Sequence, residues 1–219
     1  IKIMSAYSDL LVIRSPVEGS AYAASLYSEI PIINAGDGGH LHPTQTLTDL
    51  MTIAKLKGSY TGLNIGVCGD LLNGRTVHSL LKAFCKYSGN TFYLISTPTL
   101  AAPDYALTAL KASSNRVVEC DSIDSCIPSL DILYMTRIQR ERFSSAEDYQ
   151  KQRGVVVLDG NKLRSAKKDL CILHPLPKVD EISPEVDDDS RAKYFEQARY
   201  GMYIRMALLM LLSKNSRLT

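Results

Sequence analysis

Short apolar runs and segments with helical periodicity alternate along the whole chain. Apolar runs between turn signals indicate buried strands, and apolar residues three and four positions apart indicate helices. The predicted strands are residues 10–13, 31–33, 63–68, 91–95, 116–119, 131–135, 155–158 and 170–173. Because helical segments separate most of them, the strands are expected to form a parallel sheet with helices on both faces. The pattern therefore predicts the α/β fold class.

The clearest helical segments are residues 18–27, 43–56, 75–87 and 192–212. Pro43 suits the first position of a helix, where its missing N–H costs no hydrogen bond. An apolar stripe with helical spacing follows it, and such a stripe faces the core; it consists of Leu47, Leu50, Met51 and Ala54. The segment 192–212 is long and mostly apolar, and it is predicted to pack across the body of the protein.

A glycine-rich stretch at 34–39 indicates a boundary between two parts of the chain. The residues before it hold only one or two strand–helix units, too few to bury a core. Residues 1–38 are therefore expected to end a preceding domain, and 39–59 to connect it to a second domain. That second domain is expected to span 60–190, with 191–219 packing back across both. The first residue is Ile1, not Met, so we expect the chain to begin inside a longer protein.

The charge balance and the cysteines exclude several classes of protein. The chain has 25 basic and 23 acidic residues, which gives no basic footprint for nucleic acid. Its 5 cysteines are widely spaced without a C-x-x-C pair, which favours free thiols in a reducing compartment over disulfides or a zinc site. No apolar run reaches the roughly 18–20 residues that span a bilayer, and the start lacks signal-peptide features. A cytoplasmic protein without membrane contact is expected.

Polar residues that follow predicted strands are candidates for a site, because ligands bind at the carboxyl ends of parallel strands. Arg14 follows the first strand and can bind a carboxylate or phosphate with a forked pair of hydrogen bonds, although alone it also fits a surface salt bridge. His42 and Gln45 lie at the start of the helix at 43–56, where N–H groups and the macrodipole favour an anion or oxyanion. Arg75 opens another helix, a position that favours a cation only beside an anionic ligand.

Two further strand ends carry candidate residues. Arg137 and Gln139 follow the strand at 131–135 and can point the same way. Pro175, Leu176 and Pro177 follow the strand at 170–173, and the prolines remove N–H donors, so the carbonyls there suit an –NH2 group. Together the candidates predict a pocket for a small substrate with several anionic groups and an amide.

Two other chemistries fit the sequence poorly. The four histidines (His40, His42, His78 and His174) match no metal-ligand spacing. The glycines after the strand at 63–68 do not form G-x-G-x-x-G, which disfavours a nicotinamide-dependent oxidoreductase. No metal and no cofactor are expected.

Five segments in order along the chain resemble the aspartate transcarbamoylase family: VIRSP at 12–16, INAGDG with HPTQ at 33–45, GDLLNGRTVHS at 69–79, DILYMTRIQRERF at 131–143 and LHPLPKVDEI at 173–182. The resemblance extends from about residue 5 to residue 212. Ornithine transcarbamoylases share HPTQ but typically carry a Cys in the loop that here reads HPLP. The resemblance implies transfer of the carbamoyl group of carbamoyl phosphate to L-aspartate in pyrimidine biosynthesis, without a metal or cofactor.

The resemblance assigns a role to each candidate at the carbamoyl end of the site. Arg14 and His42 would polarise the carbamoyl oxygen as the catalytic groups, and Gln45 would bind the carbamoyl –NH2. The loop of Pro175, Leu176 and Pro177 would belong to the carbamoyl phosphate site, with its carbonyls orienting the two nitrogens.

At the other end of the site, Arg75 and Arg137 would hold the two carboxylates of aspartate, with Gln139 beside them. Residues 1–38 would end the carbamoyl phosphate-binding domain, and 60–190 would form a Rossmann-like aspartate-binding domain.

The family also implies a cytoplasmic homotrimer whose subunits share active sites; regulatory chains or fusion partners stay open. Family members carry a Ser-Thr-Arg-Thr phosphate loop that is absent from these 219 residues. We therefore expect the 219 residues alone to be inactive. Two alternatives remain: an ornithine-type carbamoyltransferase, and a non-catalytic fragment of a larger chain.

Overall fold

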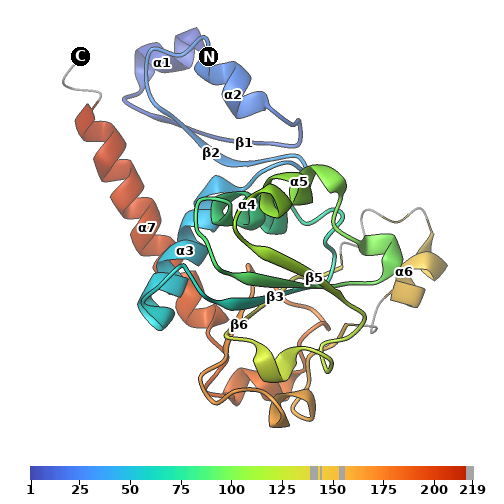
Figure 1. Ribbon diagram of the computed structural model, residues 1–219. Coiled ribbons are helices and arrows are strands. Elements are labelled where there is room, and N and C mark those ends of the chain that lie inside the picture. The colour runs from blue at the N-terminus through green and yellow to red at the C-terminus, as the bar shows by residue number, and fades with distance from the viewer. Residues whose placement is uncertain (139–142, 144, 153–155, 216–219) are drawn as a thin grey trace.

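Two parallel sheets organise the chain in the computed structural model (Figure 1), which describes residues 1–138, 143, 145–152 and 156–215. The smaller sheet pairs β1 (Leu11–Ser15) with β2 (Ile32–Asp37). The helices α1 (Lys2–Tyr7) and α2 (Ser20–Ser25) lie beside it. The larger sheet has five strands in the order β5-β4-β3-β6-β7.

The larger sheet consists of β3 (Asn64–Cys68), β4 (Thr91–Ile95), β5 (Arg116–Cys120), β6 (Ile132–Met135) and β7 (Cys171–Leu173), all paired in parallel. The chain runs outward from β3 through β4 to β5, then returns to the other side of β3 as β6 and continues to β7. The loops that leave β3 and β6 therefore diverge, which forms the crevice where open α/β sheets bind ligands. The predicted α/β class with a parallel sheet is confirmed.

Helices cover both faces of this sheet. The helices of this part of the chain are α3 (Pro43–Lys57), α4 (Arg75–Phe84), α5 (Asp104–Ala112), α6 (Ala146–Gln152) and α7 (Tyr194–Asn215), together with 3-10 turns at Pro98–Leu100, Ile127–Ser129, Lys162–Arg164 and Pro184–Asp188; α6 lies to the side of the sheet (Figure 1). On β6, Ile132 and Tyr134 join one buried apolar cluster, whereas Leu133 and Met135 join a second. Successive side chains point to opposite faces, so a strand covered on both sides is apolar throughout.

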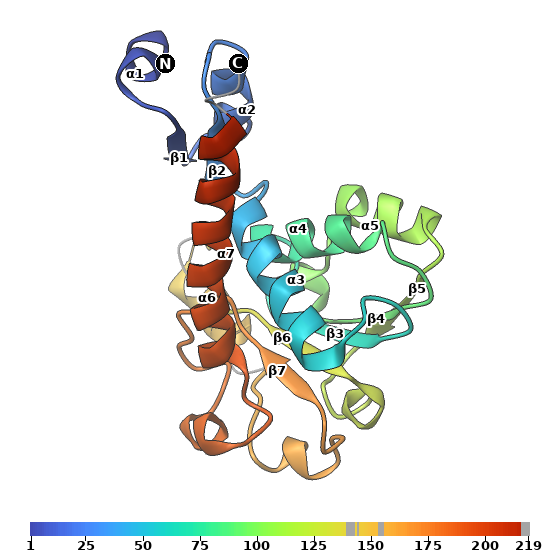
Figure 2. The ribbon, with the colours of Figure 1, turned by 90° about the vertical axis from the view of Figure 1, so that its left-hand side faces the viewer.

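The helix α7 packs along α3 and continues toward the smaller sheet (Figure 2). The buried face of α3 is mostly polar and matches the apolar stripe only in part: Leu50 of the stripe and Ile53 beside it pack in the first apolar cluster, but most of the buried residues are polar. Leu47 is 37% exposed, while Asp49 and Thr52 are 0% exposed. The buried polar groups are hydrogen-bonded: the hydroxyl of Thr52, for example, donates to the carbonyl of Thr48 one turn earlier. Such bonds remove the cost of burying these groups.

Two strand predictions were wrong in detail. The first strand is not buried, since Val12 is 58% exposed. Within the described ranges, β1 has a hydrogen-bonded strand neighbour on one edge only. The predicted strand at 155–158 is reduced to an isolated bridge between Leu158 and Ile182, and residue 155 lies outside the described residues. Within the described part of the chain, no helix is long and apolar enough to cross a bilayer.

Candidate functional site

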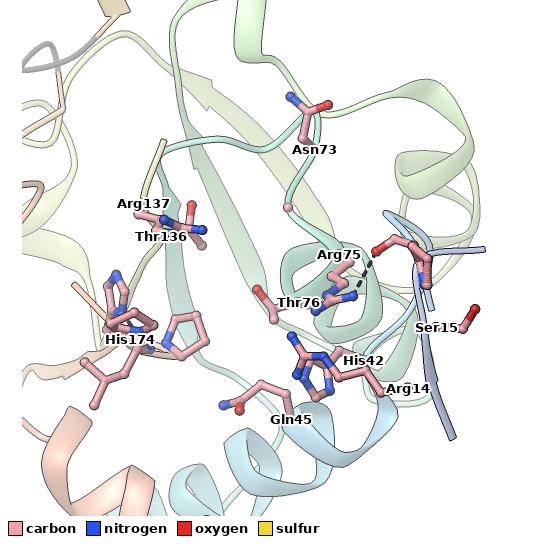
Figure 3. Close-up of a pocket in the computed structure, with 16 residues that line it drawn as sticks. Arg14, Ser15, His42, Gln45, Asn73, Arg75, Thr76, Thr136, Arg137 and His174 are labelled. Atoms are coloured by element: carbon pink, nitrogen blue, oxygen red, sulfur yellow. Dashed lines mark hydrogen bonds between the residues drawn. The ribbon is translucent and has the colours of Figure 1, made fainter. Parts of the chain in front are cut away.

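A pocket of about 730 Å³ lies where strand ends of the two sheets face each other (Figure 3). The ends of β1, β3, β6 and β7 and the start of α3 all contribute to it. The lining residues are Arg14, Ser15, Pro16, Gly38, His42, Gln45, Asn73, Gly74, Arg75, Thr76, Thr136, Arg137, His174, Pro175, Leu176 and Pro177. The pocket therefore brings together every site residue predicted from the sequence except Gln139, which lies outside the described residues.

The first turns of α3 and α4 are joined through one hydroxyl. The backbone N–H of His42 donates to the Oγ of Ser79 (2.8 Å), and the same hydroxyl donates to the carbonyl of Arg75 (2.8 Å). Both helices consequently begin at the pocket. Because helix N-termini carry partial positive charge, this arrangement favours an anionic ligand.

His42 is held neutral by its surroundings. Burial lowers its pKa first, and the positive charges of Arg75 and Arg14 lower it further, to about 4. Arg205 on α7 adds to the same effect. The Nδ1 of His42 lies 3.3 Å from the hydroxyl of Thr44. A neutral imidazole still donates one N–H, so His42 can act as a hydrogen-bond donor near pH 7 without carrying charge.

The side chain of Arg75, at the start of α4, contacts the glycine-rich stretch at the end of β2 (residues 36–39, called the glycine loop below). Its Nη1 donates to the carbonyl of Gly38 (2.9 Å). Its guanidinium lies against Gly36, where an added Cβ would be 3.2 Å from Cζ and where φ is +115°. Glycine at 36 supplies both the backbone conformation and the space. In Figure 3 Arg75 lies beside His42 and Arg14.

Arg137 lines the opposite side of the pocket, away from Arg75 (Figure 3). The residue before it, Thr136, donates from its backbone N–H (2.8 Å) and its hydroxyl (3.2 Å) to the carbonyl of Cys68. Gly69 packs so closely there that an added Cβ would lie 2.2 Å from the carbonyl oxygen of Thr136. The ends of β3 and β6 are therefore clamped together, and this contact fixes the backbone from which Arg137 projects.

A buried carboxylate holds the glycine loop in place. Asp37 is 3% exposed and accepts hydrogen bonds from the backbone N–H groups of Gly19 (2.8 Å) and Leu41 (3.2 Å) and from Asn34 Nδ2 (3.1 Å). Burial alone would raise the pKa of Asp37, but hydrogen bonds led by that of Asn34 outweigh it and lower the pKa. This ionised group ties the small sheet to the loop that precedes His42.

The loop after β7 depends on His174. Its Nδ1 accepts the backbone N–H of Leu176 (2.8 Å), and its Nε2 lies 2.7 Å from Glu181 Oε1. Leu176 has φ of 52°, a left-handed conformation that costs a non-glycine residue about 1–2 kcal/mol. The bond to His174 stabilises that turn. Burial would raise the pKa of Glu181, but bonds from His174 and from backbone N–H groups lower it.

The histidines do not form a metal site in the described part of the chain, where no group of three or more His, Cys, Asp or Glu side chains could hold an ion. His174 instead shapes the loop. Asn73, Thr76 and Thr136 line the pocket but were not singled out from the sequence. Their proximity to Arg75 and Arg137 within the same motifs was the available signal.

A second buried carboxylate, which does not line the pocket, lies next to Gln45 and was not predicted from the sequence. Asp49 is 0% exposed and lies one turn after Gln45 on α3. It accepts hydrogen bonds from Gln45, from Gln197 on α7 and from Tyr134 on β6. The only signal in the sequence was an acidic residue four positions after a site glutamine. This spacing indicates a hydrogen bond between the two side chains only once the polar face of the helix is known to be buried.

Comparisons with known proteins divide the chain into two family regions. Residues 1–55 match the carbamoyl-P binding domain of aspartate/ornithine carbamoyltransferases, and residues 61–212 match their Asp/Orn binding domain. The chain is 54% identical over 209 residues to the aspartate carbamoyltransferase catalytic subunit of Clostridium novyi, covering 95% of this chain and 68% of the relative. It is 53% identical to that of Clostridium kluyveri, with the same coverage.

Solved structures give the same result. The catalytic subunit of aspartate transcarbamoylase from M. jannaschii superposes with a TM-score of 0.90 at 44% identity, covering 97% of this chain and 69% of that one. The aspartate transcarbamoylase of Trypanosoma cruzi in complex with aspartate and phosphate superposes with a TM-score of 0.86 at 38% identity, covering 94% and 65%. The chain thus spans about two thirds of the length of its relatives. With the fold, the pocket and these matches in agreement, the chain belongs to the aspartate/ornithine carbamoyltransferase family.

Proposed function

We propose that the complete protein carrying this sequence is an aspartate carbamoyltransferase. It transfers the carbamoyl group of carbamoyl phosphate to the amine of L-aspartate, giving N-carbamoyl-L-aspartate and phosphate for pyrimidine biosynthesis. The supporting observation is one pocket with Arg14, His42 and Gln45 on one side and Arg137 on the other. Trypanosoma cruzi aspartate transcarbamoylases, solved with carbamoyl phosphate and with aspartate and phosphate, share this fold.

The carbamoyl end of the site stabilises charge on oxygen. Attack by the aspartate amine turns the carbamoyl carbonyl into a tetrahedral oxyanion, and Arg14 and His42 donate hydrogen bonds to it. Because His42 is neutral near pH 7, it donates a hydrogen bond without giving up a proton. Removal of one such preorganised donor costs about 10²–10³ in rate.

The amide end of the same substrate is held by acceptors. Gln45 and the carbonyls of Pro175 and Leu176 bind the carbamoyl –NH2 and orient the attacking amine, with Pro177 closing the loop. Holding both substrates in register supplies the entropic part of catalysis. The departing phosphate takes the proton of the amine, and the mechanism uses no metal or cofactor.

The aspartate end depends on two arginines. Arg75 and Arg137 hold the two carboxylates, with Gln139 beside them. One Nη1 hydrogen bond of Arg75 goes to Gly38, and the guanidinium has five N–H donors in all. Forked binding by arginine selects a dicarboxylate, whereas an ornithine-type enzyme needs an acidic group for the second amine. Curated relatives at 54% identity are named as aspartate enzymes, which supports the same choice.

The domain division follows from the same assignment. Residues 1–38 end the carbamoyl phosphate-binding domain, 39–59 connect, 60–190 form the aspartate-binding domain, and 191–219 pack back across both. The change of family region between residues 55 and 61 supports a boundary at the end of the connecting helix. The protein is cytoplasmic and forms a homotrimer with shared sites, as the family resemblance implies.

An assay on the complete protein tests the proposal. With carbamoyl phosphate and L-aspartate it should form carbamoyl aspartate, and with L-ornithine it should form less than about a hundredth as much product. Turnover of ornithine at a comparable rate would establish the ornithine-type alternative. No turnover of either amino acid by a folded, complete protein would establish a non-catalytic role.

A further inference from the structure

We infer that Asp49, which does not line the pocket, is a positioning residue that fixes which end of the Gln45 carboxamide faces the carbamoyl group. The inference deepens the proposed function and rests on its assignment of Gln45 to the carbamoyl –NH2. A glutamine amide can present either an oxygen, which accepts a hydrogen bond, or an –NH2, which donates. Only the oxygen can accept from the carbamoyl –NH2, so the orientation of this amide decides whether it binds or repels the substrate.

The geometry around Asp49 selects one orientation. Gln45 Nε2 donates to Asp49 Oδ1 at 2.8 Å, and Asp49 is completely buried. An ionised carboxylate only accepts hydrogen bonds, so the nitrogen of Gln45 must be the atom that points to Asp49. Gln45 itself lines the pocket. Among the described residues, Gln45 Oε1 makes no hydrogen bond, and it remains the polar atom available to a ligand.

The same oxygen orients a second amide. Gln197 Nε2 donates to Asp49 Oδ1 at 2.6 Å, which turns Gln197 Oε1 toward the backbone N–H of His174 at 2.9 Å. Gln197 is 1% exposed, so neither end of its amide has water as an alternative. His174 begins the loop whose carbonyls are assigned to the substrate nitrogens. One carboxylate oxygen thus sets the direction of two glutamines and, through them, the two sides of the –NH2 subsite.

The arrangement tolerates a proton on the carboxyl group. Burial raises the pKa of Asp49 to about 7, although bonds from Gln197, Gln45 and Tyr134 act in the opposite direction. Both glutamines donate to Oδ1, whereas among the residues that the structure describes only the hydroxyl of Tyr134 donates to Oδ2 (3.0 Å). A proton on Oδ2 faces the Tyr134 oxygen, which can accept it, and Oδ1 continues to accept from both amides. An asparagine at 49 can adopt the same pattern, with its oxygen in the place of Oδ1.

The test compares two ligands that differ at one group. Acetyl phosphate carries a methyl group where carbamoyl phosphate carries its –NH2, so the ratio of their dissociation constants measures the –NH2 subsite alone. In the complete protein, Asp49→Leu should raise the dissociation constant of carbamoyl phosphate about three- to tenfold, which corresponds to roughly one hydrogen bond. The dissociation constant of acetyl phosphate should stay within about twofold of the wild-type value. Asp49→Asn should keep the wild-type ratio. Tyr134→Phe, which removes the donor to Oδ2 and leaves both amides on Oδ1, is the matched control and should keep it too.

Each outcome separates positioning from simple support of the fold. Equal weakening of both ligands in Asp49→Leu would reduce Asp49 to a structural tie between α3 and α7. If Asp49→Asn reduced the preference for carbamoyl phosphate over acetyl phosphate as much as Asp49→Leu does, the claim that Oδ1 orients the two amides would be overturned. A wild-type protein that binds both ligands equally well would overturn it too. If Asp49→Leu does not fold, Asp49→Ser replaces it, since its hydroxyl is too short to reach both amides.

Failure of the proposed function looks different. A wild-type protein that prefers carbamoyl phosphate to acetyl phosphate but forms no carbamoyl aspartate contradicts the assigned reaction. The ratio in the Asp49 variants then still decides the inference.

Discussion

The guanidinium of Arg75 donates a 2.9 Å hydrogen bond to the carbonyl oxygen of Gly38, and this bond joins the first turn of α4 to the glycine loop of the smaller sheet. An arginine at a helix N-terminus is unfavourable with the helix dipole. Here a backbone carbonyl and the assigned substrate carboxylate compensate for that placement. With Arg75 in its proposed role, the loop around Gly38 supports the aspartate end of the site, although it comes from the other sheet.

Gly36→Ala should raise the aspartate requirement through this contact. An alanine Cβ would lie 3.2 Å from the guanidinium carbon of Arg75, and φ of +115° is strained for any side chain. We expect the KM for aspartate to rise at least fivefold and the free energy of unfolding to fall by about 1–3 kcal/mol. Steady-state kinetics and urea unfolding of the complete protein measure both.

Gly58→Ala is the matched control. Gly58 also has a positive φ (+69°), but nothing lies within 4 Å of an added Cβ. It should cost about 1 kcal/mol of stability and leave the KM for aspartate unchanged. If both variants raise this KM equally, strain alone is responsible and the contact with Arg75 is irrelevant.

Arg137→Lys should raise the aspartate requirement far more than the carbamoyl phosphate requirement. Lysine keeps the charge but loses the fork, which costs about 1–3 kcal/mol at a forked carboxylate site. Separate KM measurements for the two substrates check this. Arg116→Lys, an exposed arginine at the start of β5, should change neither KM. Equal changes in both KM values for Arg137→Lys remove this residue from the aspartate site.

His42→Ala should lower kcat by about 10²–10³, the typical value of one oxyanion donor. Because burial and nearby arginines lower the pKa of His42 to about 4, its titration should not shape the rate between pH 6 and pH 9. A pH–rate profile of the wild type and an NMR titration of the imidazole test this. His40→Ala, on an exposed neighbour, should stay within about threefold of wild type. A His42 pKa above 6 contradicts the neutral-donor assignment.

The free energy of unfolding of Asp49→Asn should increase relative to that of wild type as the pH rises. The raised folded pKa (about 7) means that the folded state keeps a proton that the unfolded state loses near pH 4. The contribution of Asp49 to the free energy of unfolding therefore falls between these pH values and levels off above pH 7. Asparagine does not titrate, so the difference in the free energy of unfolding should shift in its favour by about 2–3 kcal/mol from pH 5 to pH 8.

Asp169 provides the control of opposite sign. A hydrogen bond from Lys57 lowers its pKa, so its contribution is present at high pH and is lost on acidification. The free energy of unfolding of Asp169→Asn should thus be higher relative to that of wild type at pH 3 than at pH 6. A shift for Asp49→Asn in that same direction would show that Asp49 is ionised well below pH 7.

A preparation of these 219 residues alone should turn over no substrate. The Ser-Thr-Arg-Thr phosphate loop of the family is absent from the sequence, and a misplacement of about 1 Å already costs on the order of 10²-fold. Weak binding of dicarboxylates should remain, because Arg75 and Arg137 are present. A carbamoyl aspartate assay on material of matching intact mass, with activity within about tenfold of the complete protein, would contradict this expectation.

The inner strands of the larger sheet were predictable because they are mostly apolar on both faces, whereas the edge strand β5 exposes Arg116 and Glu119. β4 and β6 agree with prediction to within one residue, since a strand covered on both faces leaves a nearly continuous apolar run. β1 was located correctly, but its burial was not, because strand patterns do not reveal how many neighbours a strand has. The segment at 155–158 is apolar for another reason: Leu158 packs in the second apolar cluster without belonging to a ladder.

The candidate site was predictable only where short motifs carry it. Arg14, His42, Gln45, Arg75 and Arg137 all line the pocket. Asp49 was not predicted, because apolar periodicity assigns the polar face of α3 to solvent. Burial of that face depends on partners in distant parts of the chain, Gln197 and Tyr134, and no local pattern encodes such a match.

The hydrogen bonds of Asp49 determine which pocket residues would move together. They attach Gln45 to β6 and α7, so Gln45 belongs to the same block as the loop of Leu176. Arg14, by contrast, projects from β1 of the smaller sheet. Any displacement of one sheet against the other changes the span between Arg14 and Gln45 but leaves that between Gln45 and Leu176 fixed. With the proposed roles, the residue that binds the carbamoyl nitrogen (Gln45) and one donor to its oxygen (His42, the N-cap of α3) therefore move together, whereas the other oxygen donor, Arg14, moves with the smaller sheet.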